Sequence, residues 1–271
     1  MKSQAQKATE FAALHQSGCF VIPNPWDRGT ARMLAGLGFK ALTTTSAGYA
    51  RSIGVTDYKV GRDQILAHCR DLADATDLPL AADLEDGFGD APENCAETIR
   101  LSAEAGLVGG SIEDWSGAAG TFYDIEAAAD RIRAAAEAAR SLGFPFQLVA
   151  RCENYLRGRP DFADTVRRLQ AYQEAGADVL YAPCLSTAEE FAALLREVDR
   201  PVNALGGMGK APLTVSELAA LGVRRISHGS LLHSEAMTAF LKAATDETFG
   251  FVAGLTSGGE LDRLLIAGGG D

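Results

Sequence analysis

The chain has 271 residues, of which 47% are hydrophobic and 23% charged, ordinary values for a globular protein with a full core. Its formal net charge of −11 at pH 7 argues against non-specific binding to nucleic acid or to an anionic membrane surface. No segment approaches the roughly 18 uninterrupted apolar residues of a membrane span, and the N-terminus lacks the apolar core of a signal peptide. We therefore expect a cytoplasmic protein without nucleic-acid or membrane partners.

Cysteine and histidine give no sign of a metal site or a disulfide framework. The five cysteines are dispersed without a CxxC pair, which is typical of reduced thiols. His228 and His233 are five residues apart, a spacing that does not place them on one helical face.

An amphipathic helix is predicted at the N-terminus, and after it short apolar runs alternate with helical patterns. Several helical segments end in Gly just before the next run, the usual helix stop. Eight strands with about eight helices predict a (β/α)8 TIM barrel, as one domain over residues 1–271. A doubly wound sheet is the alternative, although the turn PNPWDRG lacks a glycine-rich phosphate loop. The closing LIAGGGD is expected to fray. The predicted strands are CFVIPN, ALTTTS, LPLAADLE, GGSIED, FQLVAR, DVLYAP, PVNAL and RRISHG.

Polar residues stand where these predicted strands end. In a barrel such ends surround one mouth, where active sites are built. A helix cap or a solvated loop could explain any one of them, but the carboxylates and arginine on five ends favour an enzyme. The residues are Asn24, Asp27, Thr45, Ser46, Asp83, Glu85, Asp86, Glu113, Asp114, Arg151, Glu153, Cys184, Asn203 and His228.

The stretch ADLEDGFGD concentrates negative charge at the end of a predicted strand. Asp83 and Glu85 are two residues apart, so on a strand they point to the same side. Together with Glu113 they offer an oxygen-rich set without His or Cys, which suits Mg²⁺ or Mn²⁺. The alternative to a metal site is that acids of this stretch cap the helix that begins near Pro92. We adopt this interpretation for Asp90 and reject it for Asp83 and Glu85.

Arg151 ends the apolar strand LVAR, where a buried charge needs a partner. It is interpreted either as a fork for a substrate carboxylate or oxyanion, or as a salt bridge to Glu153 or Glu113. The stretch TTTSAGYA has the hydroxyls and backbone N–H groups to cradle a carboxylate, or forms only a tight turn.

Four segments in order carry a family resemblance. NPWDRGTARMLAGLGFKALTTTSAGYARSIGVTD, ADLEDGFGD, GGSIED and LVAR resemble the isocitrate lyase/phosphoenolpyruvate mutase superfamily over residues 18–245. The resemblance implies a modified (β/α)8 barrel, often with a terminal helix swapped between subunits, and hence a homotetramer or dimer of swapped dimers. It also implies Mg²⁺-dependent chemistry on small 2-oxo or 2-hydroxy carboxylates through an enolate-like oxyanion.

The resemblance extends to individual positions. Asp83 resembles the most direct metal ligand, and Glu85 and Glu113 resemble acids that bind the metal mainly through its waters. Arg151 matches the arginine that polarises the 2-oxo group, and Asp57 a loop acid near the metal waters. The implied catalytic residues are Arg151, Asp57 and Glu113, and the implied substrate-binding residues are Thr45, Ser46, Ala47, Arg151, Asn203 and His228.

One departure bears on the reaction. The lyases of this superfamily carry a cysteine on a mobile loop that protonates the leaving carbanion, whereas the corresponding EDWSGAAGTFYD has no Cys, Lys or His. Positions of a lyase aromatic and a lyase glutamate hold Thr43 and Cys184. His228 or Tyr123 is a substitute donor only by speculation.

Four functions therefore remain open. We expect a Mg²⁺-dependent carbon–carbon lyase with good affinity for 2-oxo acids but weak turnover. Oxaloacetate decarboxylation, phosphonopyruvate P–C chemistry and non-catalytic binding of 2-oxo acids are the alternatives.

Overall fold

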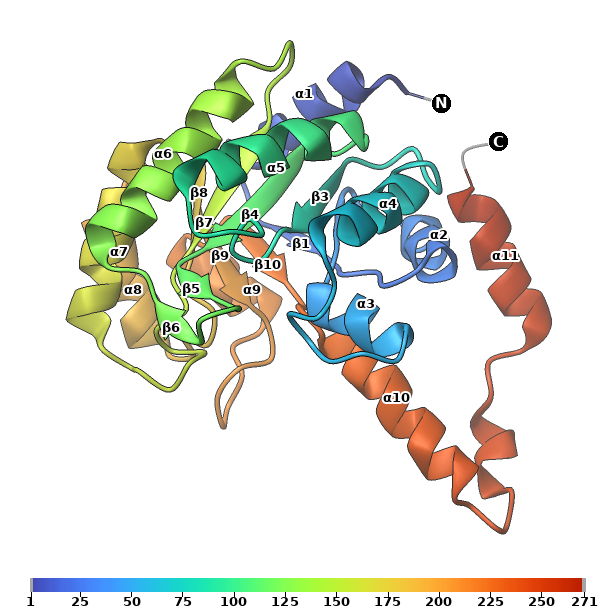
Figure 1. Cartoon of the computed structure of the whole chain (residues 1–271). Coiled ribbons are helices and arrows are strands. Elements are labelled where there is room, and N and C mark those ends of the chain that lie inside the picture. The colour runs from blue at the N-terminus through green and yellow to red at the C-terminus, as the bar shows by residue number, and fades with distance from the viewer. Residues whose placement is uncertain (1, 270–271) are drawn as a thin grey trace.

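Eight parallel strands form one sheet that curls into a barrel (Figure 1). The structure is a computed structural model and describes residues 2–269. The strand order is β1-β10-β9-β8-β7-β4-β3-β2, and the Thr43 N–H donates to the Pro23 carbonyl at 3.1 Å, which joins β2 back to β1. The strands are β1 Phe20–Ile22, β2 Leu42–Thr43, β3 Leu80–Asp83, β4 Gly109–Glu113, β7 Gln147–Arg151, β8 Val179–Tyr181, β9 Val202–Leu205 and β10 Arg225–Ser227.

Each of these strands lies within one of the eight predicted apolar runs, so the predicted barrel is confirmed. The helices cover its outer face (Figure 1), and no helix among residues 2–269 has the length and apolarity to cross a membrane. The helices are α1 Gln4–Leu14, α2 Arg28–Gly36, α3 Ser46–Ser52, α4 Arg62–Ala73, α5 Pro92–Glu104, α6 Ile125–Arg140, α7 Phe162–Ala175, α8 Ala188–Glu197, α9 Val215–Leu221, α10 Leu231–Ala244 and α11 Gly258–Gly268.

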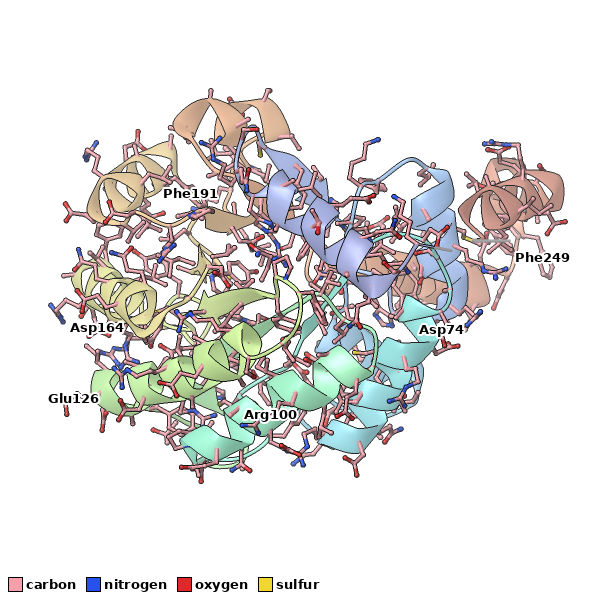
Figure 2. All side chains as sticks on the ribbon, turned by 90° about the horizontal axis from the view of Figure 1, so that it is seen from above. Asp74, Arg100, Glu126, Asp164, Phe191 and Phe249 are labelled. Carbon is pink, nitrogen blue, oxygen red and sulfur yellow. The ribbon has the colours of Figure 1, made fainter. Side chains whose placement is uncertain are left out.

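Helix α1 closes the amino-terminal end of the barrel. Its Ala8 and Phe11 are fully buried against Ile22 of β1, Ala81 of β3 and Val108 just before β4. Figure 2, viewed from above, shows α1 in front of the central strands. Because this end is filled by apolar side chains, the polar strand ends face the opposite, open end.

Two parts of the chain depart from a simple barrel. The segment after β4 forms a small antiparallel hairpin, β5 Trp115–Ser116 with β6 Thr121–Phe122, which the sequence did not predict. Helix α10 leaves the barrel, and after the short 3₁₀ helix Gly250–Gly254 the chain returns as α11, which lies beside α2 (Figure 1).

The expectation that the closing segment frays is wrong for residues 265–268. They are helical in α11, and residues 270–271 lie outside the described part of the chain. The contact with α2 is close enough that a Cβ added to Gly268 would stand 1.8 Å from the Arg32 carbonyl oxygen. Glycine therefore allows the two helices to touch.

A buried ion network ties α7 to the barrel. Asp164 accepts hydrogen bonds from Arg168 Nε at 2.8 Å and Asn154 Nδ2 at 3.0 Å, and Arg168 Nη1 reaches Asp114 at 3.0 Å. Burial opposes the charged form, but the bonds from Asn154 and Arg168 lower the pKa of Asp164 to about 2. Figure 2 shows Asp164 on this helix.

We predict that Asp164→Asn loses about 2 kcal/mol of unfolding free energy at pH 7. Because the folded-state pKa is depressed, this stability is fully present above the unfolded pKa of about 4 and disappears as the pH falls through about 2. Urea unfolding at pH 7 and pH 3 should show a smaller mutational effect at pH 3. Asp130→Asn, which breaks an exposed pair with Arg133, is the control and should change little. An equal loss for both variants would contradict the role of the network.

Candidate active site

A cavity of about 320 Å³ opens at the carboxyl ends of the strands, a size suited to a small ligand. Seven of the predicted site residues line it: Thr45, Ser46, Ala47, Asp57, Asp83, Arg151 and Asn203. Glu85, Glu113 and His228 do not line it. Most of the predicted set is thus brought together, although the functional roles stay predictions. The other lining residues are Asn24, Thr43, Thr44, Arg51, Tyr58, Ser111, Val149, Leu156, Arg157, Tyr181, Pro183, Leu205, Arg225, Ser227, Gly229 and Ser230.

Asp83 is the last residue of β3 and forms part of the cavity wall. Its Oδ2 accepts a hydrogen bond from Ser46 Oγ at 2.8 Å, and its backbone N–H donates to Thr44 Oγ1 at 3.0 Å. Arg151 Nη1 lies 3.5 Å from Oδ1. The strand end and the start of α3 therefore hold this carboxylate in one orientation with part of its surface open to the cavity.

Arg151, the last residue of β7, stands at the centre of three carboxylates. Its Nε donates to Glu153, and its Nη1 lies 3.4 Å from Glu113 and 3.5 Å from Asp83. Burial disfavours the charged guanidinium and lowers its pKa. The charges of Glu153, Glu113 and Asp83 outweigh this effect of burial and raise the pKa of Arg151 well above its ordinary value. The salt bridges considered in the sequence are therefore present, and the guanidinium also lines the cavity.

Glu113 ends β4 just beneath the cavity surface and is 3% exposed. Burial and the neighbouring Glu153 raise its pKa well above the ordinary carboxyl value. The Tyr58 hydroxyl donates to it, and Arg157 Nη2 donates to the same hydroxyl. Tyr58 thus separates Glu113 from the cavity.

Backbone geometry allows Tyr58 to take this place. Its φ of 60° is in the left-handed region, which is unusual for a non-glycine residue. A Cβ added to Gly117 would stand 2.1 Å from the Tyr58 ring, so the hairpin needs glycine here. The Arg157 guanidinium carbon also lies over this ring, 5.0 Å from the ring centroid.

Glu85 does not share the direction of Asp83, contrary to the strand-based expectation. Strand β3 ends at Asp83, and Glu85 has a φ of 49°, so the alternation of a strand no longer applies. It faces an adjoining recess that Asp86 and Asp90 also line. Burial, followed by the charges of Asp83 and Asp57, raises the pKa of Glu85 to about 9.

The turn that carries these acids is held from outside the barrel. Arg131 of α6 is buried and donates to the carbonyl oxygens of Asp86, Gly89 and Asp90. Asp90 does not cap helix α5, whose N-cap is Ala91, and the capping interpretation is wrong. Its carboxylate instead accepts a hydrogen bond from the Tyr123 hydroxyl at 2.7 Å.

Four further candidates have distinct surroundings. Asp57 has a buried Oδ1 without a partner among the described residues, and burial and Asp83 raise its pKa. Asn203 Nδ2 donates to Ser227 Oγ at 3.0 Å. The His228 backbone N–H donates to Asn24 Oδ1 at 2.9 Å. Tyr123, held by Asp90, does not line the cavity, so neither substitute donor reaches it.

The carboxylates fit a hard, partly hydrated divalent cation. Among the described residues no three His, Cys, Asp or Glu side chains form a ready set of direct ligands. Mg²⁺ keeps several waters and commonly uses one or two protein carboxylates. Burial, followed by the charge of neighbouring acids, raises the pKa values of Asp57, Glu85 and Glu113, and a bound cation would favour their charged forms. Asp83 therefore fits a direct ligand, and Asp57, which also lines the cavity, fits an acceptor for metal-bound water.

Sequence reasoning missed several residues of the site. Glu153 was predicted as a strand-end residue and a possible partner of Arg151 but not as part of the site, and no role was predicted for Tyr58, Arg157 and Arg225. Arg225 could have been noticed, because it is a charged residue two positions before Ser227 on the same side of a strand. Tyr58 and Arg157 lie on loops, where side-chain direction follows no period.

The fold and this site define a (β/α)8-barrel enzyme with a carboxylate–arginine centre at the carboxyl ends of its strands. The family model of phosphoenolpyruvate phosphomutase matches residues 11–247, and the chain belongs to this family, within the isocitrate lyase/phosphoenolpyruvate mutase superfamily. It is an enzyme of the lyase class.

Three known proteins illustrate the relationship. A crystal structure described as a lyase/mutase from Burkholderia cenocepacia is 55% identical, with a TM-score of 0.92 over 96% of this chain and 95% of that chain. The 2-methylisocitrate lyase of Halalkalibacterium halodurans is 30% identical over 224 residues, which are 78% of this chain and 72% of that protein. A phosphonopyruvate hydrolase in complex with oxalate and Mg²⁺ is 25% identical, with a TM-score of 0.81 over 95% and 94% of the two chains.

We predict that Arg151→Met lowers the unfolding free energy by about 3 kcal/mol, because it leaves Glu113 and Glu153 buried without their main partner. Thermal unfolding should show a fall of roughly 10 °C in Tm. The double variant Arg151→Met/Glu153→Gln should recover part of the stability, since it also removes one of the repelling charges. An unchanged Tm for the single variant would show that Arg151 does not hold the carboxylates together.

Proposed function

We propose that this protein is a Mg²⁺-dependent carbon–carbon lyase for a small 2-oxo or 2-hydroxy polycarboxylate, similar to the methylisocitrate and isocitrate lyases. The observation that carries the proposal is the convergence of Asp83 and Arg151 on one cavity. A carboxylate that suits Mg²⁺ and a fixed guanidinium are the two groups that an enolate-forming cleavage requires. The relationship to 2-methylisocitrate lyase supports it.

When bound, Mg²⁺ would supply a Lewis acid for the 2-oxo group. Asp83 would hold the cation directly, and Asp57 would accept a hydrogen bond from its waters. Glu113, behind Tyr58, and Glu85, in the adjoining recess, would act on the cation through their charge. Arg151 would stabilise the negative charge that develops on the 2-oxo oxygen. It is held by Glu113 and Glu153, so it costs little reorganisation during the reaction.

The other residues would bind the two ends of the substrate. Thr45, Ser46 and Ala47 border the cavity beside Asp83 and would hold the carboxylate next to the 2-oxo group. Asn203 and the strand ends near His228 would contact the rest of the molecule. The closed, apolar amino end of the barrel limits how deeply a ligand can enter.

Oxaloacetate decarboxylation is the second candidate, favoured by the composition of the cavity wall. No cysteine or histidine is found among the lining residues of the described chain, and the segment 113–124 forms a hairpin without either. Carbon–carbon lyase turnover benefits from a positioned acid by 10²–10⁴-fold. A decarboxylation leaves an enolate that solvent can protonate.

We expect turnover to require Mg²⁺ or Mn²⁺, to stop with excess EDTA, and to be lost in Asp83→Asn. The assay is a metal-supplemented screen of methylisocitrate, isocitrate, oxaloacetate and phosphonopyruvate that follows keto-acid formation or loss. Slow methylisocitrate cleavage with faster oxaloacetate loss would favour the decarboxylase. Ser52→Ala, an exposed position on α3, is a control that should retain activity. Full turnover in EDTA would contradict the proposal, and tight 2-oxo-acid binding without turnover would support a binding protein instead.

We also propose that the protein is a cytoplasmic homo-oligomer in which a second copy covers α10. Phe240 and Leu241 of this helix are each 62% exposed, and Figure 1 shows that α10 extends away from the barrel. Such apolar exposure on the outer part of a helix is typical of an interface. The five unpaired thiols fit the reducing cytoplasm.

Sedimentation of the wild-type protein should give a mass several times the 28.5 kDa of one chain. The double substitution Phe240→Glu/Leu241→Glu should shift it towards the single-chain mass, because a buried unpaired charge opposes association. The control Val215→Glu, at a position on α9 that is 51% exposed, should leave the sedimented mass unchanged. A wild-type protein that sediments as one chain at micromolar concentration contradicts the proposed assembly.

A further inference from the structure

Arg225 carries a buried cation that no carboxylate of the described chain pairs with. It is the first residue of β10 and is 4% exposed. Its Nε and Nη1 are enclosed and have no hydrogen-bond partner within residues 2–269. Burial lowers its pKa to about 10, so the guanidinium still carries its charge at neutral pH. An unpaired buried charge is strongly unfavourable, so its presence calls for a ligand.

This guanidinium lies at the floor of the cavity. Arg225 lines the same cavity as Arg151, but it stands two residues before the strand end at Ser227, whereas Arg151 is the last residue of its strand. On its other side, the centroid of the Phe11 ring lies 5.9 Å from the guanidinium carbon. Helix α1 therefore closes the space beneath it, and only the cavity is open to a partner.

Two partly buried arginines of the cavity have their charges offset. Arg151 contacts Asp83, Glu113 and Glu153, and Arg157 contacts Glu153 at 3.2 Å. The cavity thus has one end where carboxylates and arginines balance and one end where a single arginine stands without an acid. A ligand that is anionic at both ends would match this arrangement.

Asn203 supplies a second unsatisfied group beside Arg225, its sheet partner. Its Oδ1 is buried without a hydrogen-bond partner in the described chain, while its Nδ2 donates to Ser227 Oγ at 3.0 Å. Because the neighbouring strand offers an amide here and not a carboxylate, Arg225 has no charged partner on that side.

We propose that Arg225 forms an anion subsite at the cavity floor that binds the second carboxylate of a dicarboxylate substrate. This inference rests on the proposed function, in which Arg151 and the metal site take the 2-oxo-acid end. It makes Arg225 a specificity-determining residue that selects 2-oxo dicarboxylates over 2-oxo monocarboxylates of the same length. A guanidinium favours charge-assisted binding of a carboxylate, and because Nε and Nη1 are enclosed, the Nη2 side is the part of Arg225 that faces the cavity.

The test compares two ligands that differ only in one terminal group. Calorimetry with saturating Mg²⁺ measures the Kd of 2-oxoglutarate, which ends in a carboxylate, and of 2-oxopentanoate, which ends in a methyl group. In the wild-type protein 2-oxoglutarate should bind at least about 30-fold more tightly. In Arg225→Met the ratio should fall to about threefold or less, with the Kd of 2-oxopentanoate unchanged. The control Arg224→Met removes an exposed neighbour that bonds the Gly18 carbonyl at 3.0 Å and should keep the wild-type ratio.

A stability measurement separates this role from a structural one. Ligand-free Arg225→Met should unfold at the same or a higher temperature than the wild type, because it removes an unpaired buried charge. A lower Tm together with an unchanged ligand ratio would make Arg225 a structural residue and overturn the proposal. Stabilisation of the wild type by sodium chloride that is lost in Arg225→Met, again with an unchanged ratio, would show a site for a free inorganic anion and also overturn it.

The outcome is independent of whether the enzyme turns over. Preference for 2-oxoglutarate that is lost in Arg225→Met, in a protein that cleaves none of the screened compounds, would support the subsite and contradict the lyase. Turnover of a dicarboxylate with no effect of Arg225→Met on the ratio would contradict the subsite alone. A wild-type protein without any preference for the dicarboxylate overturns the proposal.

Discussion

The repulsion between buried carboxylates at the ends of three strands is the constraint around which this site is organised. Asp83 ends β3, Glu113 ends β4, and Glu153 follows β7 by two residues. In the low-dielectric interior these groups cannot all stay charged without a nearby cation. Arg151 supplies that cation from the middle of the group, and its own charge is stable there only because the three acids surround it.

The barrel makes this arrangement possible and also limits it. Parallel neighbours place the ends of β3, β4 and β7 side by side, with Glu113 in register with Arg151. One guanidinium does not balance all the acids, and burial together with the neighbouring acids raises the pKa values of Glu85 and Glu113. A divalent cation would favour their charged forms. The same feature that makes the ligand-free site electrostatically unfavourable therefore prepares it for a metal.

The two ends of the cavity differ in what they have left unsatisfied. Near Asp83 the carboxyl groups outnumber the arginines that contact them, whereas near Arg225 a positive charge stands without an acid among the described residues. Left-handed backbone at Tyr58 and Glu85 adds local strain around the acidic end. Such unfavourable features are commonly maintained where a ligand later relieves them. The two ends of the cavity thus indicate how a ligand lies in it, with its metal-binding group near Asp83 and an anionic group near Arg225.

Sequence alone determined the barrel, because eight apolar runs between helical patterns leave few other packings, and every run became a strand. It also brought most of the candidate site together, since the ends of parallel strands meet at one mouth whatever the details of the loops. Strand periodicity failed for Glu85, where the strand had already ended, and the composition of the 113–124 segment did not reveal its hairpin. The place of Tyr58 over Glu113 and the isolation of Arg225 were decided only by the tertiary structure. Both depend on which side chains from distant segments lie nearby, and no local pattern in a sequence records whether a buried charge has found its partner.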